Sequence, residues 1–198
     1  MSLRPLALGL LLGMAPVHAV AARAADPAVQ RIDAYDQAIV GVMKQGRALG
    51  LAGRAEKFQP IVADYYDTAA AAALVAGASG WAKASPADRA ALVAALIRHN
   101  AVSHATNYKS YSGETFTADP QSVARGAERL VRVRVGGTQI VYRLREGEGR
   151  WRIVDVVADG VSQLAVQRAD YASTVASSGV AGLAKRIAAI DARTLRGR

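Results

Sequence analysis

The chain has 198 residues, no cysteine and a formal charge of +9 at pH 7. Its length is typical of a single domain that can bury a sizeable core or reserve part of that core for a cavity. Without cysteine, neither disulfides nor thiol chemistry can contribute, and the positive charge favours an acidic partner.

Residues 1–24 predict a secretory signal peptide, because a basic residue precedes an apolar run that ends in small residues suited to signal peptidase. Cleavage sites fit after Ala19 and after Ala24. We favour the second site, because Asp26 and Pro27 then begin the mature chain as a helix start. The alternative is an uncleaved anchor helix, for which the apolar run is short.

The predicted mature domain, residues 25–198, stays basic. Cleavage removes Arg4 and Arg23 from the 25 basic residues and none of the 16 acidic ones, so the formal charge becomes +7. We expect an exported basic domain to meet anionic lipid head groups or an acidic protein. Nucleic acid is not expected as a partner.

Four helical segments are predicted before the first strand. They are residues 26–50, the segment around residues 58–66, the alanine-rich residues 68–80, and a segment that Ser85 is suited to cap. The second and fourth segments each carry one apolar stripe at helical spacing. These stripes are Phe58, Ile61, Val62, Tyr65 and Tyr66 in the second, and Leu92, Val93, Leu96 and Ile97 in the fourth.

Three antiparallel strands are predicted at residues 129–135, 138–146 and 151–157, and a fourth is expected at residues 113–119. Gly136-Gly137 forms the tight turn of a hairpin between the first two. Because successive side chains of a strand point to opposite faces of a sheet, alternate residues of each strand share a face. The apolar face carries Val131, Val133, Val135, Ile140, Tyr142, Leu144, Trp151 and Ile153, together with Asp155 and Val157; the opposite face carries Arg132, Arg134, Arg143, Arg145 and Arg152.

The chain returns to helix after Ser162, which is suited to cap it, and Ser178-Gly179 separates a last helix. The predicted fold is therefore α+β. It consists of a curved antiparallel sheet of about four strands, with the N- and C-terminal helices packed on its apolar face.

A search for catalytic chemistry finds no motif that supports it. The chain has no G-x-S-x-G elbow and no glycine-rich loop that begins a helix. His99 and His104 point about 140° apart on a helix, so a shared metal is not expected, and both are interpreted as solvated surface residues. Asp155 and Asp159 could be drawn as an acid and base, but Asp155 is better explained as an acceptor for a nearby arginine or for the following helix start. Neither a cofactor nor an enzymatic activity is expected.

The arginine face has two interpretations. It can be a solvated face whose charges prevent aggregation, or it can be a docking surface for an acidic partner or an anionic membrane through Arg132, Arg134, Arg143, Arg145 and Arg152. The aromatic side chains likewise fit either a packed core or the wall of a cavity. Tyrosine suits a lipid pocket, because its ring is apolar and its hydroxyl can stay at a wet rim.

Residues 151–187 resemble the C-terminal signature of the MlaC-like family, also called the toluene-tolerance family. The pattern is a strand ending W-basic-x-x-D-V, a G-V-S turn, a helix with an arginine and an aromatic residue, and a glycine before a last helix. Matching positions are Trp151, Arg152, Asp155, Val156, Gly160, Val161, Ser162, Arg168, Tyr171, Gly179 and Leu183. The upstream segments "VMKQGRALGLAGRAEKFQPIVADYYD", "WAKASPADRAALVAALI" and "NYKSYSGETF" are most similar to the HpnM branch, associated with hopanoid biosynthesis, so the resemblance covers about residues 30–190.

The resemblance implies a periplasmic lipid carrier that shuttles a phospholipid or hopanoid-type lipid between membrane-bound donor and acceptor complexes. Its lipid would lie between the sheet and the helices. The residues expected to bind it are Phe58, Val62, Tyr65, Tyr66, Leu96, Tyr108, Val133, Tyr142, Trp151, Ile153, Leu164 and Tyr171. The family commonly has phenylalanines and a tyrosine where this chain has Leu92, Leu96 and Ser103 or His104, so the ligand stays open among phospholipid, hopanoid and another sterol-like lipid.

Two other classes of function remain as alternatives. A small pocketed hydrolase or isomerase would need a positioned base that the sequence does not reveal. An adaptor without lipid would only dock partners through its arginines. The contents of the pocket separate the three, because a carrier retains lipid, an enzyme turns over a substrate and an adaptor has a packed interior.

Overall fold

A computed structural model describes residues 25–197. The predicted signal peptide lies outside this range. The helices are α1 (Pro27–Lys44), α2 (Gly46–Tyr65), α3 (Thr68–Lys83), α4 (Pro86–Asn107) and α5 (Gln163–Leu195). The strands are β1 (Phe116–Ala118), β2 (Val123–Arg125), β3 (Glu128–Val135), β4 (Thr138–Gly147), β5 (Arg150–Ala158) and β6 (Val161–Ser162).

The fold combines helices with one antiparallel sheet, as the sequence predicted, but the sheet has six strands rather than four. The strand order is β1-β3-β4-β5-β6, and β2 pairs with the other half of the β3 edge that β1 uses. The additional strands, β2 and β6, are only three and two residues long. Segments this short show no alternation that could be recognised in the sequence.

A β-bulge in β5 changes which side chains share a face. Arg143 pairs with Asp155, whereas Leu144 pairs with Ile153, so Val154 is an extra residue on β5. Simple alternation along β5 predicted that Asp155 and Val157 share the apolar face with Trp151, and this prediction was wrong. The extra residue reverses the alternation, so that Asp155 lies beside Arg143 on the arginine face and Val156 joins Tyr142 on the apolar face.

Helix starts agree with the sequence. The side chains of Asp26, Ser85 and Ser162 each accept a backbone N–H of the following helix. Residue Gly179 interrupts α5 with φ 65° and ψ −171°, a conformation open essentially only to glycine, so the predicted break is present as a kink. Gly77 interrupts α3 in a similar way, with φ 69° and ψ 159°.

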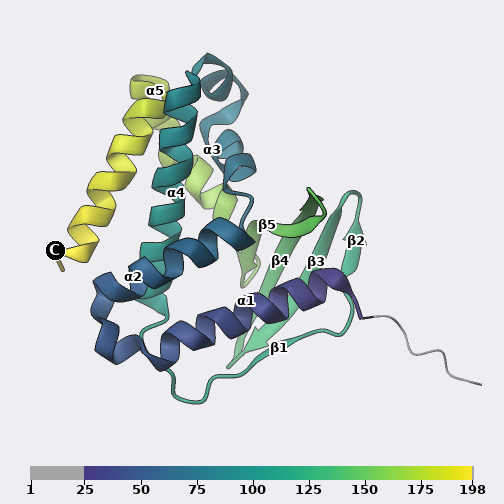
Figure 1. The fold of residues 1–198 in the computed structure, drawn as a ribbon. Helices are drawn as coiled ribbons and strands as arrows, with labels where there is room; N and C mark the ends of the chain where they lie inside the picture. Colours follow the sequence, from purple (N-terminus) through teal and green to yellow (C-terminus); the bar gives the residue numbers. More distant parts are fainter. Residues whose placement is uncertain (1–24, 198) are drawn as a thin grey trace, which may run out of the picture.

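The structure has two apolar cores, which meet along helix α4. The first core joins the inner face of the sheet to α1, α2 and the C-terminal half of α4, and the second joins α3, the N-terminal half of α4 and α5. Figure 1 shows α1 lying across the sheet, while α3, α4 and α5 gather beside it. Helix α4 belongs to both cores, since Leu92 and Leu96 pack in the second and Val102 and Ala105 in the first.

Among residues 25–197, no helix has both the length and the apolar character needed to cross a membrane.

Candidate functional site

A cavity of about 310 Å³ lies where the two cores meet. It is lined by β4 and β5, by α4 and by the first turns of α5. Tyr35 of α1 and Tyr66, which follows α2, complete the lining. Its deeper wall is aromatic, formed by Tyr35, Tyr66, His104, Tyr108 and Tyr142. Polar residues form its rim, and Ser103, Asn107 and Gln163 among them are exposed. The rim residues are Asn100, Ser103, Asn107, Gln163 and Gln167.

The deep wall contains a connected hydrogen-bond network. The Tyr35 hydroxyl lies 2.9 Å from the Tyr66 hydroxyl and 2.5 Å from Nε2 of His104. Nδ1 of His104 donates to the Asn100 carbonyl oxygen over 2.7 Å. The sequence interpretation of His104 as a solvated surface residue was therefore wrong, because the side chains that surround it come from elements distant in the sequence.

His99 is corrected in the same way. Its Nδ1 lies 2.7 Å from Oδ1 of Asp191, whose side chain is 1% exposed, so it joins α4 to the end of α5. Within the part of the chain that the structure describes, no group of three metal-ligating side chains comes together.

Burial sets the charge states in the cavity. It lowers the pKa of His104 to about 4, although the bond to the Asn100 carbonyl works in the opposite direction. Burial also raises the pKa of Tyr66 above its ordinary value and that of Tyr108 to about 12. At neutral pH these three side chains are therefore uncharged. The cavity offers hydrogen-bonding groups without a formal charge on its aromatic wall.

A groove continues from the cavity between α3 and α5. Its lining is mostly small and apolar but includes the charged residues Lys83, Asp88, Arg143 and Arg168. Leu164 lines both the cavity and a hollow of about 480 Å³, in which Leu74, Ala169 and Ala172 also take part. A further hollow of about 740 Å³ shares Ala172 and Arg168 with the hollow of about 480 Å³. We call these two hollows together the α3–α5 groove.

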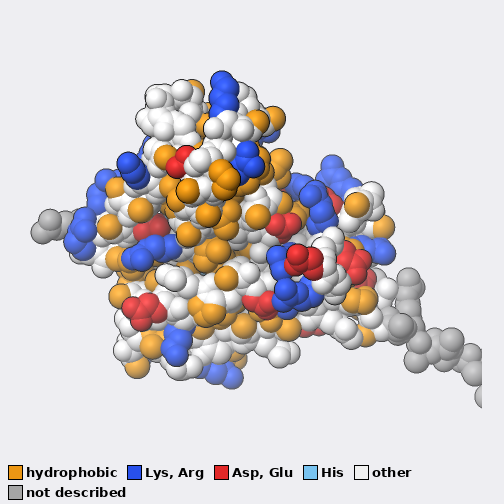
Figure 2. Space-filling model, turned by 45° about the horizontal axis from the view of Figure 1, so that its top comes forward, with side chains coloured by type: hydrophobic (Ala, Val, Ile, Leu, Met, Phe, Trp, Pro, Cys, Tyr) orange, Lys and Arg blue, Asp and Glu red, His pale blue; other side chains and the backbone are white. Residues whose placement is uncertain are grey.

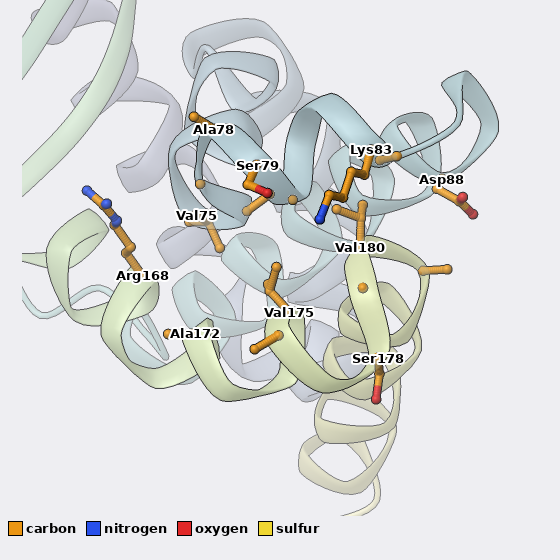
Figure 3. A pocket seen from close by; sticks show the side chains of 17 residues that line it. Val75, Ala78, Ser79, Lys83, Asp88, Arg168, Ala172, Val175, Ser178 and Val180 are labelled. Carbon is orange, nitrogen blue, oxygen red and sulfur yellow. The ribbon is translucent and has the colours of Figure 1, made fainter.

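The groove is wide because the residues along it are small and two helices bend there. Figure 3 shows Val75 and Ala78 of α3 facing Ala172 and Val175 of α5, with Arg168 at one end. Both kink glycines, Gly77 and Gly179, belong to its wall. Figure 2 shows hydrophobic side chains forming a band on one face of the molecule, flanked by charged residues.

Four of the residues predicted to bind lipid line the cavity, namely Tyr66, Tyr108, Tyr142 and Leu164. Four others, Phe58, Val62, Val133 and Ile153, are packed in the first core, and Tyr65 and Trp151 lie against that core. The remaining two, Leu96 and Tyr171, are packed in the second core. The structure thus brings one third of the predicted set to the cavity wall.

Sequence reasoning missed Tyr35, His104 and the polar rim of α4. A signal for the rim was present, because Asn100, Ser103, His104 and Asn107 recur at spacings of three and four, which places them on one helix face. That face was overlooked because the apolar stripe was followed only as far as Ile97.

Each arginine of the predicted docking surface has a carboxylate partner. Asp119 pairs with Arg132 and Arg134, Glu128 with Arg143 and Arg145, and Glu148 with Arg152. Asp155 forms a further pair with Arg143. The face therefore carries compensated charge rather than a row of free cations, which weakens its attraction for an acidic surface.

A buried carboxyl on α1 predicts an unusual dependence of stability on pH. Asp36 is 5% exposed, and its Oδ1 has no hydrogen-bond partner among the described residues. Burial raises its pKa from 3.8 to about 8, with the charge of Asp33 adding to the effect. The folded protein therefore holds a proton that the unfolded chain has released, so stability is lost as the pH rises from about 4 to about 8.

We expect Asp36→Asn to remove this loss. The advantage of the variant over the wild type in free energy of unfolding should grow by about 1.4 kcal/mol for each pH unit between pH 5 and pH 8. Urea unfolding at the two pH values measures the difference, with Asp170→Asn, at an exposed position of α5, as the control that should change little. An advantage of Asp36→Asn that is equal at both pH values would contradict the raised pKa.

Comparison with known proteins gives two matches. A family model described as MlaC protein matches residues 33–189. A solved structure of a phospholipid-binding protein from Ralstonia solanacearum, in complex with a phospholipid, superposes with a TM-score of 0.66 at 19% identity. That superposition covers 86% of this chain and 99% of the other. Among curated proteins, no sequence matches significantly.

Proposed function

The chain belongs to the MlaC family, and on that premise we propose that it is a non-enzymatic lipid carrier of the periplasm. It would take up a phospholipid or a hopanoid-type lipid from one membrane-bound complex and deliver it to another. The predicted signal peptide supports the compartment, and the upstream segments support the HpnM branch. The observation that carries the proposal is the cavity at the junction of the two cores, in a fold shared with a phospholipid-bound protein.

The arrangement of the cavity and groove supports lipid binding. A ligand pocket usually has an apolar surface with a few polar groups that fix its occupant, and volumes of about 300–1,000 Å³ are typical. The cavity supplies the polar groups, and the α3–α5 groove supplies apolar surface that continues from Leu164. A lipid with a hydrocarbon chain longer than the cavity can extend into the groove.

The proposal is tested by measuring the lipid that the native protein carries. Purified from its own periplasm without detergent, the protein should carry about one lipid molecule per chain, because burying the hydrocarbon removes apolar surface from water. Mass spectrometry of an organic extract measures the amount and identifies the lipid. A periplasmic protein of similar charge, purified in parallel, controls for lipid that adheres without a specific site.

Repeated native preparations without lipid would contradict the carrier proposal and favour an adaptor that only docks partners. Release of a chemically altered lipid would instead favour an enzyme. The paired arginines leave the docking surface as a weaker proposal. Its most accessible members are Arg132, Arg134 and Arg145, each about half exposed.

A further inference from the structure

The hydrogen-bond network of the cavity has a fixed direction. A carbonyl oxygen can only accept, so the Nδ1 of His104 that contacts the Asn100 carbonyl carries the hydrogen. In the neutral ring Nε2 then has no hydrogen and accepts a bond. Its nearest donor is the Tyr35 hydroxyl at 2.5 Å, so the Tyr35 hydrogen is directed to His104.

The same reasoning assigns the next hydroxyl. Because the Tyr35 hydrogen is directed to His104, the 2.9 Å contact between Tyr35 and Tyr66 needs a hydrogen from Tyr66. The longer 3.5 Å contact of Tyr66 with Nε2 of His104 would use the same hydrogen. In either case Tyr66 has no hydrogen left for a ligand. Tyr66 lines the cavity, and toward a ligand its oxygen can only accept.

The rest of the wall carries no cation that would pair with a phosphate. Among the described residues that line the cavity there is no lysine and no arginine. Asp155 is also among the lining residues, but its side chain lies on the arginine face, where its carboxylate already accepts from Arg143, Ser162 and the backbone of Leu164. An anionic head group placed here would lose its hydration without gaining a cation.

We propose that the cavity receives the uncharged hydroxyl end of a lipid alcohol, with Tyr66 accepting the hydrogen bond that the ligand donates. This inference rests on the proposed function and names the chemical class of its lipid. The amide side chains at the rim, Asn100, Asn107 and Gln167, can serve further hydroxyls. The hydrocarbon part leaves past Leu164 into the α3–α5 groove, so the lipid is held with its polar end inside.

Three probes that share one alkyl chain test the inference. They are 1-hexadecanol, its methyl ether, which lacks the donor, and hexadecylphosphocholine, which carries a phosphate. Each is offered to the wild-type protein at equal concentration in vesicles, and the retained probe is measured by mass spectrometry after the vesicles are removed. We expect the alcohol to be retained about tenfold more strongly than the ether, the usual size for one buried hydrogen bond whose loss leaves its partner unsatisfied.

The variant Tyr66→Phe should reduce that preference to about one, because the acceptor is removed while the ring remains. Tyr111→Phe is the matched control, since Tyr111 is 40% exposed and lies outside the cavity, and it should keep the preference. Equal retention of alcohol and ether by the wild type, or preferred retention of the phosphocholine, would overturn the inference while the carrier proposal stands. Failure to retain any probe, together with native protein free of lipid, would overturn both.

Discussion

Replacing Val133 by arginine is expected to prevent the protein from folding. Val133 is fully buried in the first core, where β3 pairs with β1 and β4, and it does not line the cavity. A guanidinium at this position would be buried without a partner, which costs several kcal/mol. Since a domain is typically stable by only about 5–15 kcal/mol, we expect loss of the native circular dichroism signal and of soluble protein.

The matched variant places the same charge on the cavity wall. Val156 is half-buried, pairs with Tyr142 and lines the cavity, so Val156→Arg can extend its guanidinium toward the polar rim. We expect this variant to fold with a native spectrum and to lose its lipid, as measured by extraction and mass spectrometry. Folded Val133→Arg protein without lipid would show instead that Val133 faces the ligand, as the sequence predicted.

The sequence predicted those features that depend on local chemistry. Helix caps at Ser85 and Ser162 depend on one side chain and the next three residues, and both were predicted correctly. The Gly136-Gly137 hairpin turn was also predicted correctly, because it joins two clearly alternating strands. The apolar and arginine faces of β3 and β4 followed from the same alternation.

Features that depend on a partner strand could not be read in this way. The bulge at Val154 is defined by its pairing with Arg143 and Leu144, and no residue near it, glycine or otherwise, signals an insertion. It moved Asp155 and Val156 to opposite faces from those predicted. For the same reason the sequence could not distinguish the cavity wall at Val156 from the packed core at Ile153.

The cavity itself was predicted only in part. Tyr66 and Tyr142 were identified because aromatic residues on apolar faces are typical of pocket walls. Tyr35 was not among the residues predicted to bind lipid, and His104 was assigned to the surface, because a single histidine gives no local sign of its surroundings. Their contact joins residues 69 positions apart in the chain, so it depends on how α1 and α4 cross.

The second large effect is expected at Asp155, whose side chain is 1% exposed. One carboxylate oxygen accepts from Nη1 of Arg143 at 3.0 Å and from the Ser162 hydroxyl at 2.7 Å, and the other accepts from the Leu164 N–H at 3.1 Å. Asp155 therefore joins the bulged strand to the first turn of α5. Asp155→Ala should lower the free energy of unfolding by about 3 kcal/mol, since the half-buried Arg143 guanidinium, the Ser162 hydroxyl and the Leu164 N–H lose the buried carboxylate that accepts from them.

The control is Asp159→Asn, at an exposed turn residue with φ 48°, a conformation that asparagine tolerates. It should change the stability by less than about 0.5 kcal/mol in urea unfolding. Because Leu164 and Gln167 line the cavity from the helix that Asp155 holds, the alanine variant should also retain less lipid than the control at a temperature where both are folded. Normal stability of Asp155→Ala would show that Glu128 alone satisfies Arg143 and that Ser162 alone fixes the start of α5. Normal stability with reduced lipid would instead assign Asp155 to the ligand rather than to the fold.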